Sequence, residues 1–300
     1  MRSSRRLLLR IAALANPALH FPWVPQASLA EPPPRLEAAV DPLFGRLRNR
    51  YILFRPGETI FEAADMVDSN PINKGVRERG LTNEGRQQVL RSVEALRNLG
   101  VDSPTIWYDN GARATQTADI IGRELSVPRA RMEPEFRWLE ARGLGALDGT
   151  PLREASVRVR ALDALDIDNR PDETNDATPS DSVNDVFSRM RNTVLKIENS
   201  YSGGDFVIVP GDYTVLSVFA AAACGVDLRE HGRFELRPGE FYDLRELTRD
   251  VRAGRFEPMQ QRVLTEREVA QGREAIREIG PKIFSETEAG SWVLGPGVLR

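Results

Sequence analysis

Cysteine and histidine are scarce in this chain, which has one cysteine, Cys224, and two histidines, His20 and His231. A single cysteine excludes an intramolecular disulfide, and Cys224 follows four alanines, a setting typical of a small buried side chain. No group of residues has metal-ligand spacing, and the glycines between 143 and 149 do not form a dinucleotide-binding fingerprint. The sequence therefore indicates no metal and no cofactor. We expect His231 to be a solvated loop residue.

Acidic residues are absent from the first 30 positions, where Arg2, Arg5, Arg6 and Arg10 precede the first acid, Glu31. The segment 4–9 resembles a twin-arginine export signal, and Ala30 suits a cleavage site. We expect a targeting leader over 1–30, addressed to the thylakoid lumen of a chloroplast or to bacterial twin-arginine export, with a mitochondrial address or no address as alternatives. Prolines interrupt its apolar run, so we expect no membrane span.

A basic stripe is also missing. The formal net charge of the whole chain is −3, and removing a leader with four arginines and no acid takes it to −7. This balance argues against nucleic acid as a partner. A protein partner or a small anionic ligand is still compatible with this net charge.

Strand and helix patterns alternate between residues 50 and 250. The apolar runs 51–54, 105–108 and 206–209 predict buried strands, and the spacing of apolar residues predicts helices over 82–100, 112–125, 183–197 and 213–224. We expect a hairpin over 234–247 and leave 126–180 irregular. The prediction is an α/β fold of three layers, α/β/α, with a mainly parallel central sheet. Residues 31–49 form a linker, and 251–300 form an extension with a helix over 266–279.

Polar residues and a proline follow three of the predicted strands. Arg55, Asp109 and Pro210 each stand at or directly after a strand end. Ligands of parallel sheets bind beyond the carboxyl ends of the strands. We therefore expect these three residues to line one crevice.

Five ordered segments then give the chain a specific resemblance to the histidine phosphatase superfamily, in its phosphoglycerate mutase-like branch. They lie at 55–59, 81–88, 109–117, 139–149 and 207–212. The third keeps Arg113, Ala114, Gln116 and Thr117 of the family pattern but has Asp109 in place of its serine. The resemblance implies a phosphoglycerate mutase-like fold and a crevice that binds phosphate.

The catalytic residues that the resemblance implies are replaced. Pro56 stands at the position of the nucleophilic histidine, Pro210 at that of the second histidine, and Ala141 at that of the acid, with Glu140 one residue earlier. Proline has no side-chain lone pair and no backbone N–H, so no phosphohistidine can form at Pro56.

The remaining crevice residues are ligand-binding candidates with a competing structural role. The resemblance implies that Arg55 and Arg113 clamp phosphate, yet Glu62, Asp109 and Asp212 are carboxylates that can neutralise them. We favour internal ion pairs. The full set of candidates is Arg55, Glu58, Glu62, Asp109, Arg113, Glu140, Arg142, Gly211 and Asp212.

Three functions fit these observations. The leading hypothesis is a catalytically inactive protein, a pseudoenzyme that binds a partner or serves as a scaffold. The alternative is a phosphatase or mutase-like hydrolase that works through a carboxylate such as Glu58, Asp109 or Asp212. A structural subunit of a larger assembly is the third. An enzyme needs a carboxylate in an open crevice near a free arginine, whereas in a scaffold protein we expect these carboxylates to be paired.

Overall fold

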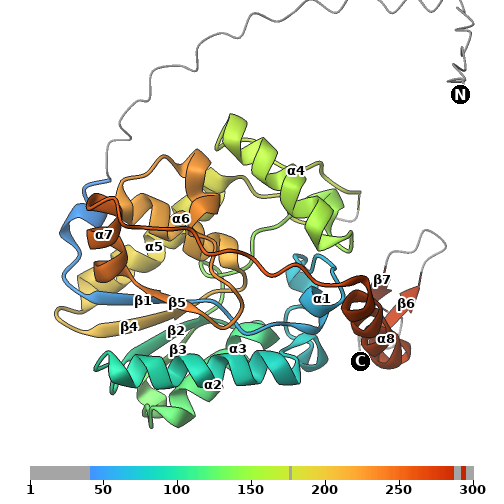
Figure 1. The fold of residues 1–300 in the computed structure, drawn as a ribbon, viewed down its shortest axis with the longest axis horizontal. Coiled ribbons are helices and arrows are strands. Elements are labelled where there is room, and N and C mark those ends of the chain that lie inside the picture. Colours follow the sequence, from blue (N-terminus) through green and yellow to red (C-terminus); the bar gives the residue numbers. More distant parts are fainter. Residues whose placement is uncertain (1–40, 176–177, 287–291, 295–300) are drawn as a thin grey trace, which may run out of the picture. The chain divides into compact units, whose positions relative to one another are not determined.

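The computed structural model describes residues 41–175, 178–286 and 292–294, and a five-stranded sheet lies at its centre (Figure 1). Strands β1 (Arg50–Phe54), β2 (Thr105–Asp109), β3 (Met132–Glu135) and β4 (Asp205–Val209) run parallel. Strand β5 (Phe241–Asp243) is antiparallel to β1, and the order across the sheet is β3-β2-β4-β1-β5. The predicted mainly parallel sheet is confirmed.

Helices cover both faces of this sheet. Helices α2 (Asn83–Asn98) and α3 (Ala112–Glu124) lie on one face, and α5 (Val183–Ser200), α6 (Tyr213–Cys224) and α7 (Leu244–Arg252) lie on the other (Figure 1). Side chains alternate along each strand, so Ile52 packs against α2 and α3 while Leu53 packs against α6 and α7. The three-layer α/β/α prediction is confirmed.

Helix starts follow the polar residues that the sequence places before them. The hydroxyl of Thr82 accepts a hydrogen bond from Gly85 N–H at the start of α2, as predicted. Ser182 forms a capping box with Asp185 at the start of α5. The Asp212 carboxylate accepts the N–H groups of Thr214 and Val215 at the start of α6. Each cap fixes where the chain turns from a strand or loop into a helix.

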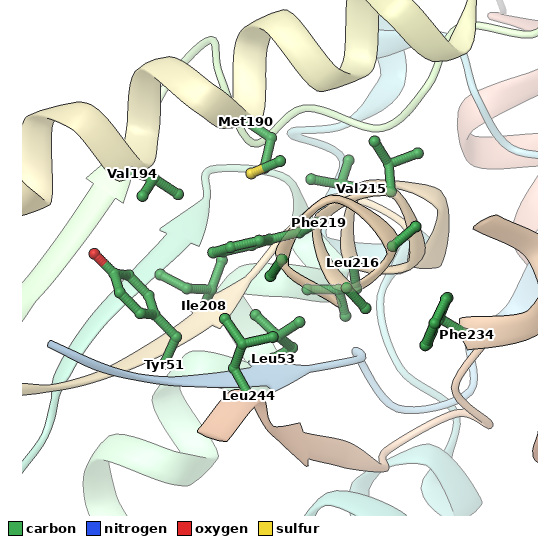
Figure 2. Packing of buried hydrophobic residues seen from close by; sticks show 14 of the residues in the cluster. Tyr51, Leu53, Met190, Val194, Ile208, Val215, Leu216, Phe219, Phe234 and Leu244 are labelled. Carbon is green, nitrogen blue, oxygen red and sulfur yellow. The ribbon is translucent and has the colours of Figure 1, made fainter. Parts of the chain in front are cut away.

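Aromatic side chains fill the core between the sheet and the α5–α7 layer (Figure 2). The rings of Tyr51 and Phe219 are 5.7 Å apart, and Phe44 lies 5.7 Å from Phe219 as well. The Tyr51 hydroxyl donates to Glu198 over 2.7 Å, so its polar end is paired. Because Phe44 is buried here, the packed part of the chain begins before Arg50.

Two local predictions were wrong. The segment 234–247 is not a hairpin: only β5 forms, it pairs with β1, and helix α7 starts directly after it. The region assigned as irregular contains α4 (Leu152–Leu165), which starts after Pro151 without a side-chain cap. Asp163 lies on the buried side of α4, which breaks the apolar pattern that a helix normally shows.

Short elements connect these layers. They are the helix α1 (Ile60–Ala63) and the 3-10 turns η1 (Phe44–Arg46), η2 (Pro71–Asn73), η3 (Arg77–Arg79), η4 (Arg129–Arg131), η5 (Gly145–Leu147) and η6 (Leu228–Phe234). A small separate pair of strands, β6 (Phe284–Glu286) and β7 (Trp292–Leu294), is antiparallel.

The C-terminal extension crosses from α7 to α1. Phe256 stacks on Phe234 at 4.9 Å, and Gln261 donates to the Glu235 carbonyl over 3.0 Å. Helix α8 (Glu266–Ile283) confirms the predicted helix and continues four residues further. It packs on α1, where Ile276 is buried in one cluster with Phe61. The extension is thus fixed to the domain at several points.

The predicted leader, residues 1–30, and most of the predicted linker lie outside the described residues. Within the described ranges, no helix is long and apolar enough to cross a membrane.

The contact between α8 and α1 can be tested at Gly272. A Cβ atom there would lie 2.3 Å from the Ala63 carbonyl oxygen, although alanine normally favours a helix over glycine by about 1 kcal/mol. We therefore expect Gly272→Ala to displace α8, seen as faster amide hydrogen exchange over residues 266–283. Gln271→Ala, at the adjacent exposed position, is the control and should leave exchange unchanged. Equal protection in both variants would contradict the packing.

Candidate functional site at the strand ends

The carboxyl ends of β1 and β4 and the start of α3 surround a small inner cavity of about 50 Å³. Its lining includes Arg55, Pro56, Arg113, Gly211 and Asp212. Pockets that hold drug-sized ligands measure roughly 300–1,000 Å³. The inner cavity therefore has room for only a few water molecules. Asp109 and Pro210 reach the same sheet edge but do not line the cavity.

Arg55 is held by its own chain. One of its Nη atoms donates to Glu62 Oε1 over 2.6 Å, and the other donates to the carbonyl oxygen of Leu236. The guanidinium also lies 4.5 Å from the centre of the Tyr213 ring. The predicted ion pair between Arg55 and Glu62 is confirmed, and the arginine is nearly buried by these contacts.

Glu62 is fixed in place by the start of α1. Its Oε2 accepts the Thr59 N–H over 2.8 Å, and the Thr59 hydroxyl accepts the Glu62 N–H, which makes a capping box. One carboxylate oxygen therefore caps the helix while the other binds Arg55. The ion pair is part of the local fold and not a chance surface contact.

Arg113 is held by a carboxylate that the sequence analysis did not select. Its Nη2 donates to Asp68 Oδ2 over 2.8 Å and to the Asp68 carbonyl oxygen over 2.6 Å. The other oxygen of Asp68 accepts a hydrogen bond from Arg79, whose guanidinium lies 4.3 Å from the Phe61 ring centre. Asp68 bridges two arginines. The expectation that Asp109 or Asp212 would pair with Arg113 was wrong.

Pro56 and Pro210 are both buried, and both continue the extended backbone that leaves a strand. The Pro56 carbonyl oxygen accepts the Gly239 N–H over 2.9 Å. Directly after it, a Cβ on Gly57 would lie 2.2 Å from the Gly85 carbonyl oxygen, so the loop needs glycine to pass α2. Both proline positions are therefore compatible with the fold.

Asp212 and Gly211 join the β4 end to the segment that follows β3. The Gly211 N–H donates to the Leu139 carbonyl over 2.8 Å, and a Cβ on Gly211 would lie 2.4 Å from the Ala141 nitrogen. Asp212 Oδ2 accepts the Arg142 N–H over 3.1 Å. Burial raises the pKa of the Asp212 carboxyl above its ordinary value. The N–H groups of Arg142, Thr214 and Val215, which donate to this carboxylate, offset only part of that rise. All of its contacts are structural.

Arg142 is fully buried and cannot meet a ligand. Its two Nη atoms donate to both oxygens of Asp163 over 2.7 and 2.8 Å, and its Nε donates to the Asp181 carbonyl over 2.9 Å. Burial raises the pKa of Asp163, but the hydrogen bonds from His231 and Arg142 outweigh it and lower the pKa overall. Its selection as a ligand-binding candidate finds no support in this geometry.

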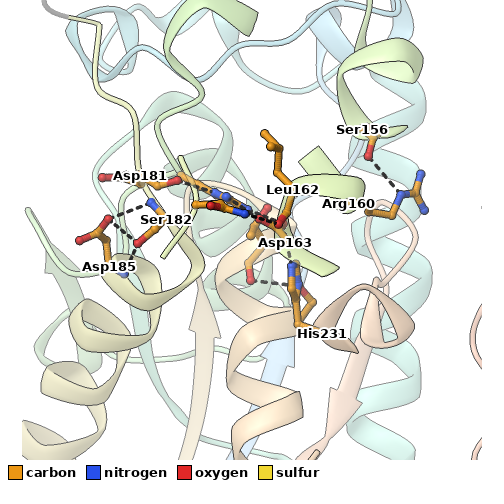
Figure 3. Close-up of polar contacts among 12 residues, drawn as sticks. Ser156, Arg160, Leu162, Asp163, Asp181, Ser182, Asp185 and His231 are labelled. Atoms are coloured by element: carbon orange, nitrogen blue, oxygen red, sulfur yellow. Dashed lines mark hydrogen bonds and ion pairs between the residues drawn. The ribbon is translucent and has the colours of Figure 1, made fainter. Parts of the chain in front are cut away.

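His231 is buried, so the expectation of a solvated loop histidine was wrong. Its Nδ1 lies 2.8 Å from Ser217 Oγ and its Nε2 lies 3.1 Å from Asp163 Oδ2 (Figure 3). The three residue types of a hydrolase triad thus lie in a row, but the two ring nitrogens are reversed, because a triad histidine faces its serine with Nε2. Ser217 is moreover fully buried inside α6. The row of contacts joins α4, α6 and η6, and it does not line the inner cavity.

Asp109 lies to one side of the inner cavity. Its Oδ2 accepts the Gly111 N–H over 2.8 Å, Lys74 Nζ is 3.9 Å from its Oδ1, and burial raises its pKa to about 6. Lys74 forms an ion pair with Glu140. Glu140 therefore does not turn into the inner cavity.

A wider outer pocket of about 500 Å³ adjoins the inner cavity and shares Arg55, Glu62 and Tyr213 with it. Glu58 lines this pocket, where burial raises the pKa of its carboxyl and the Thr82 hydroxyl donates to it over 3.0 Å. Residues 261–264 of the C-terminal extension form one wall. Both acidic and basic side chains line this pocket.

No local pattern in the sequence indicates the role of Asp68, which the sequence analysis missed, or of His231, which it placed in solvent. Asp68 lies in a loop 45 residues before Arg113, and His231 meets Asp163 across 68 residues. The Thr59–Glu62 spacing is the one missed feature that a capping-box pattern could have revealed. In the described ranges, no group of three or more His, Cys, Asp or Glu side chains is arranged to hold a metal ion.

The raised pKa of Asp109 predicts a pH effect on stability. The folded chain binds this proton more tightly than the unfolded chain, whose ordinary value is 3.8, so stability falls as pH rises from about 4 to 6. We expect wild type to lose about 2 kcal/mol of unfolding free energy relative to Asp109→Asn between pH 4 and pH 7. Urea denaturation at each pH measures this. The exposed Asp119→Asn is the control, and parallel profiles for wild type and Asp109→Asn would contradict the prediction.

Comparison with known proteins places the sequence in a family. A sequence model of the histidine phosphatase superfamily (branch 1) matches residues 52–257. No curated protein matches the chain.

Solved structures of similar fold include three bacterial proteins. A mycobacterial hydrolase has 19% identity and a TM-score of 0.48, covering 61% of this chain and 84% of its own. A mycobacterial glucosyl-3-phosphoglycerate phosphatase, solved with VO3, has 18% identity and a TM-score of 0.47 over 61% and 85%. A protein of Bacillus stearothermophilus has 21% identity and a TM-score of 0.47 over 61% and 83%.

The family match extends over more than two thirds of the sequence, from the third residue of β1 to beyond α7, and includes each strand end described above. The chain belongs to the histidine phosphatase superfamily, branch 1.

Proposed function

We propose that this protein is a catalytically inactive member of its superfamily that acts as a binding or scaffold protein. The observation that carries the proposal is the pairing of both candidate phosphate-clamping arginines with carboxylates of the same chain. Arg55 binds Glu62 over 2.6 Å and Arg113 binds Asp68 over 2.8 Å. The positive charge of each guanidinium is therefore already balanced by a carboxylate of the same chain.

The charge and size of the inner cavity support the same conclusion. Three carboxylates and two guanidinium groups line it, so its formal charge does not favour an anion. Two like charges about 4 Å apart repel by about 4 kcal/mol at a surface-like dielectric constant. The volume of about 50 Å³ also limits the size of any group that could bind in the inner cavity.

The replaced nucleophile supports inactivity on chemical grounds. By the resemblance, Pro56 and Pro210 occupy the two histidine positions, and a proline nitrogen within a peptide has neither a proton nor a free lone pair. His231 does not substitute for them, because Ser217 and Asp163 hold it away from the inner cavity. Phosphoryl transfer through an imidazole thus has no candidate among the described residues.

A turnover assay tests the proposal. We expect the purified full chain to hydrolyse an aryl phosphate and 3-phosphoglycerate no faster than its Arg113→Ala variant does. The same result is expected with and without a chelator. Heat-treated protein provides the background rate. Metal-independent turnover that Arg113→Ala abolishes would overturn the assignment of inactivity.

Removing the carboxylates should restore anion binding. We expect Glu62→Gln/Asp68→Asn to bind inorganic phosphate about tenfold or more tightly than wild type, because neither guanidinium group then has a carboxylate partner. Glu94→Gln/Asp119→Asn changes the net charge equally at exposed positions and should not alter affinity. Calorimetric titration measures both.

Loss of the Asp68 carboxylate removes an ion pair from both Arg79 and Arg113 and destabilises the fold, so the single variant Glu62→Gln serves as the second test. It should bind phosphate more tightly than wild type while keeping the Asp68 contacts. Unchanged affinity in both variants would show that pairing is not what prevents binding.

A carboxylate-dependent hydrolase is the second candidate, and Glu58 is the residue that favours it. Glu58 is half-buried with a raised pKa and lines the outer pocket, which suits a general acid or base. Arg55, which lines the same pocket, is occupied by Glu62 and is not available to assist it. Turnover in the assay above that is abolished by Glu58→Gln would favour this candidate.

A further inference from the structure

Two dipeptides in this chain place glycine directly after a side chain that can cyclise onto the main chain. They are Asn110–Gly111, the only Asn-Gly pair in the sequence, and Asp148–Gly149, the only Asp-Gly pair. In such a pair the glycine nitrogen can attack the carbonyl carbon of the preceding side chain and close a five-membered imide ring, because glycine has no side chain that hinders the attack. The structure holds the two pairs in different ways.

The Asp148–Gly149 pair is fixed on both sides of its peptide bond. Asp148 Oδ1 accepts hydrogen bonds from the Ser69 N–H over 2.6 Å, the Ser69 hydroxyl over 2.9 Å and the Asn70 N–H over 3.1 Å. The Gly149 N–H donates to the carbonyl oxygen of Val67 over 3.0 Å. A carbonyl oxygen is too weak a base to take a proton from an amide, so this pair has no acceptor for the proton that ring closure releases.

The Asn110–Gly111 pair differs at both points. Asn110 Oδ1 is buried and has no hydrogen-bond partner among the described residues, so its oxygen does not fix the side-chain amide in place. The Gly111 N–H donates to Asp109 Oδ2 over 2.8 Å. A carboxylate, unlike a carbonyl oxygen, can accept a proton as a general base. The attacking nitrogen and the group that would take its proton are therefore already in contact.

The surroundings of Asp109 favour this role. Burial raises its pKa to about 6, which makes its ionised form a stronger base than an ordinary carboxylate. Lys74 Nζ lies 3.9 Å from Asp109 Oδ1, so a positive charge lies beside the carboxylate. A Cβ atom at Gly111 would lie only 2.6 Å from Asp109 Oδ2. The contact between Asp109 and the main chain thus requires glycine after Asn110.

We propose that Asn110 is a site of self-modification, at which the Gly111 nitrogen attacks the Asn110 side-chain amide and the Asp109 carboxylate accepts the Gly111 proton. A bond forms between the Gly111 nitrogen and Asn110 Cγ, the bond from Cγ to Nδ2 breaks, and the proton held by Asp109 leaves with ammonia. Water then opens the imide at one of its two carbonyl carbons. The products are aspartate or isoaspartate at position 110, and no oxidant or reductant takes part.

Both products change the edge of the sheet where β2 leads into α3. Each adds a negative charge next to the buried Asp109, and like charges close together repel. Isoaspartate also lengthens the main chain by one methylene group directly before Gly111, the N-cap of α3. Helix α3 carries Arg113, which binds Asp68. The modification therefore alters charge and main-chain length at the strand ends without a bound ligand.

Mass spectrometry of peptides from the full chain, incubated at neutral pH, tests the site. We expect conversion of Asn110 to be about tenfold or more faster in the folded chain than in the same chain in urea, because folding holds the Asp109 carboxylate on the Gly111 N–H. Asp109→Asn keeps the size of the side chain and should slow the folded reaction about tenfold or more. Asp119→Asn makes the same change at an exposed position of α3 and should match wild type.

The pH dependence of the rate gives a second readout that needs no variant. In the folded chain the rate should rise through about pH 6, as Asp109 ionises, and then level off, whereas in urea it should keep rising with hydroxide. Conversion that is no faster in the folded chain than in urea would show that the fold does not activate Asn110. Equal rates in wild type and Asp109→Asn would remove the role of the carboxylate. Either result overturns the proposal, and neither bears on the turnover assay, so the two proposals fail separately.

Discussion

The paired guanidinium groups of Arg55 and Arg113 are the interaction on which the character of this protein depends. Unpaired arginines at the carboxyl ends of parallel strands form an anion site, because their charge adds to the positive end of the helix that starts there. Here Glu62 and Asp68 supply the negative charge from within the chain. The fold that carries the site remains. The positive charge that would attract a phosphoryl group is already neutralised within the chain.

The surrounding structure keeps those pairs in place. Glu62 caps α1, α1 packs against α8, and Asp68 binds Arg79 as well as Arg113. Breaking a buried pair by removing one partner costs about 3–5 kcal/mol, because the remaining charge loses its compensation. A ligand that displaced Glu62 or Asp68 would have to offset a similar cost. The pairing is therefore a structural property of the domain and not a state that a weak anion can reverse.

The sequence predicted the features that neighbouring residues determine. It missed the features that depend on contacts between residues far apart in the chain. Strands β1, β2 and β4 were found because each is a short buried apolar run, and the parallel order then brought Arg55, Asp109 and Pro210 to one edge. The pair Arg55–Glu62 was predictable, since its residues are seven positions apart. The pair Arg113–Asp68 was not, because Asp68 lies in a loop whose path no periodicity specifies. Helix α4 was missed for a related reason: its buried Asp163 is explained only by Arg142 and His231, which come from distant segments.

The buried row of Ser217, His231 and Asp163 shows why residue types alone do not establish an activity. Its distances, 2.8 and 3.1 Å, are those of a catalytic relay, yet a nucleophile must meet its substrate and Ser217 has no exposed surface. Asp163 is moreover bound by both Nη atoms of Arg142, so its charge is already balanced. The same reasoning applies to Arg55 and Arg113, which keep the residue type of an anion clamp but not its availability. In both places the partner that each charged group already has within the chain decides what it can still bind.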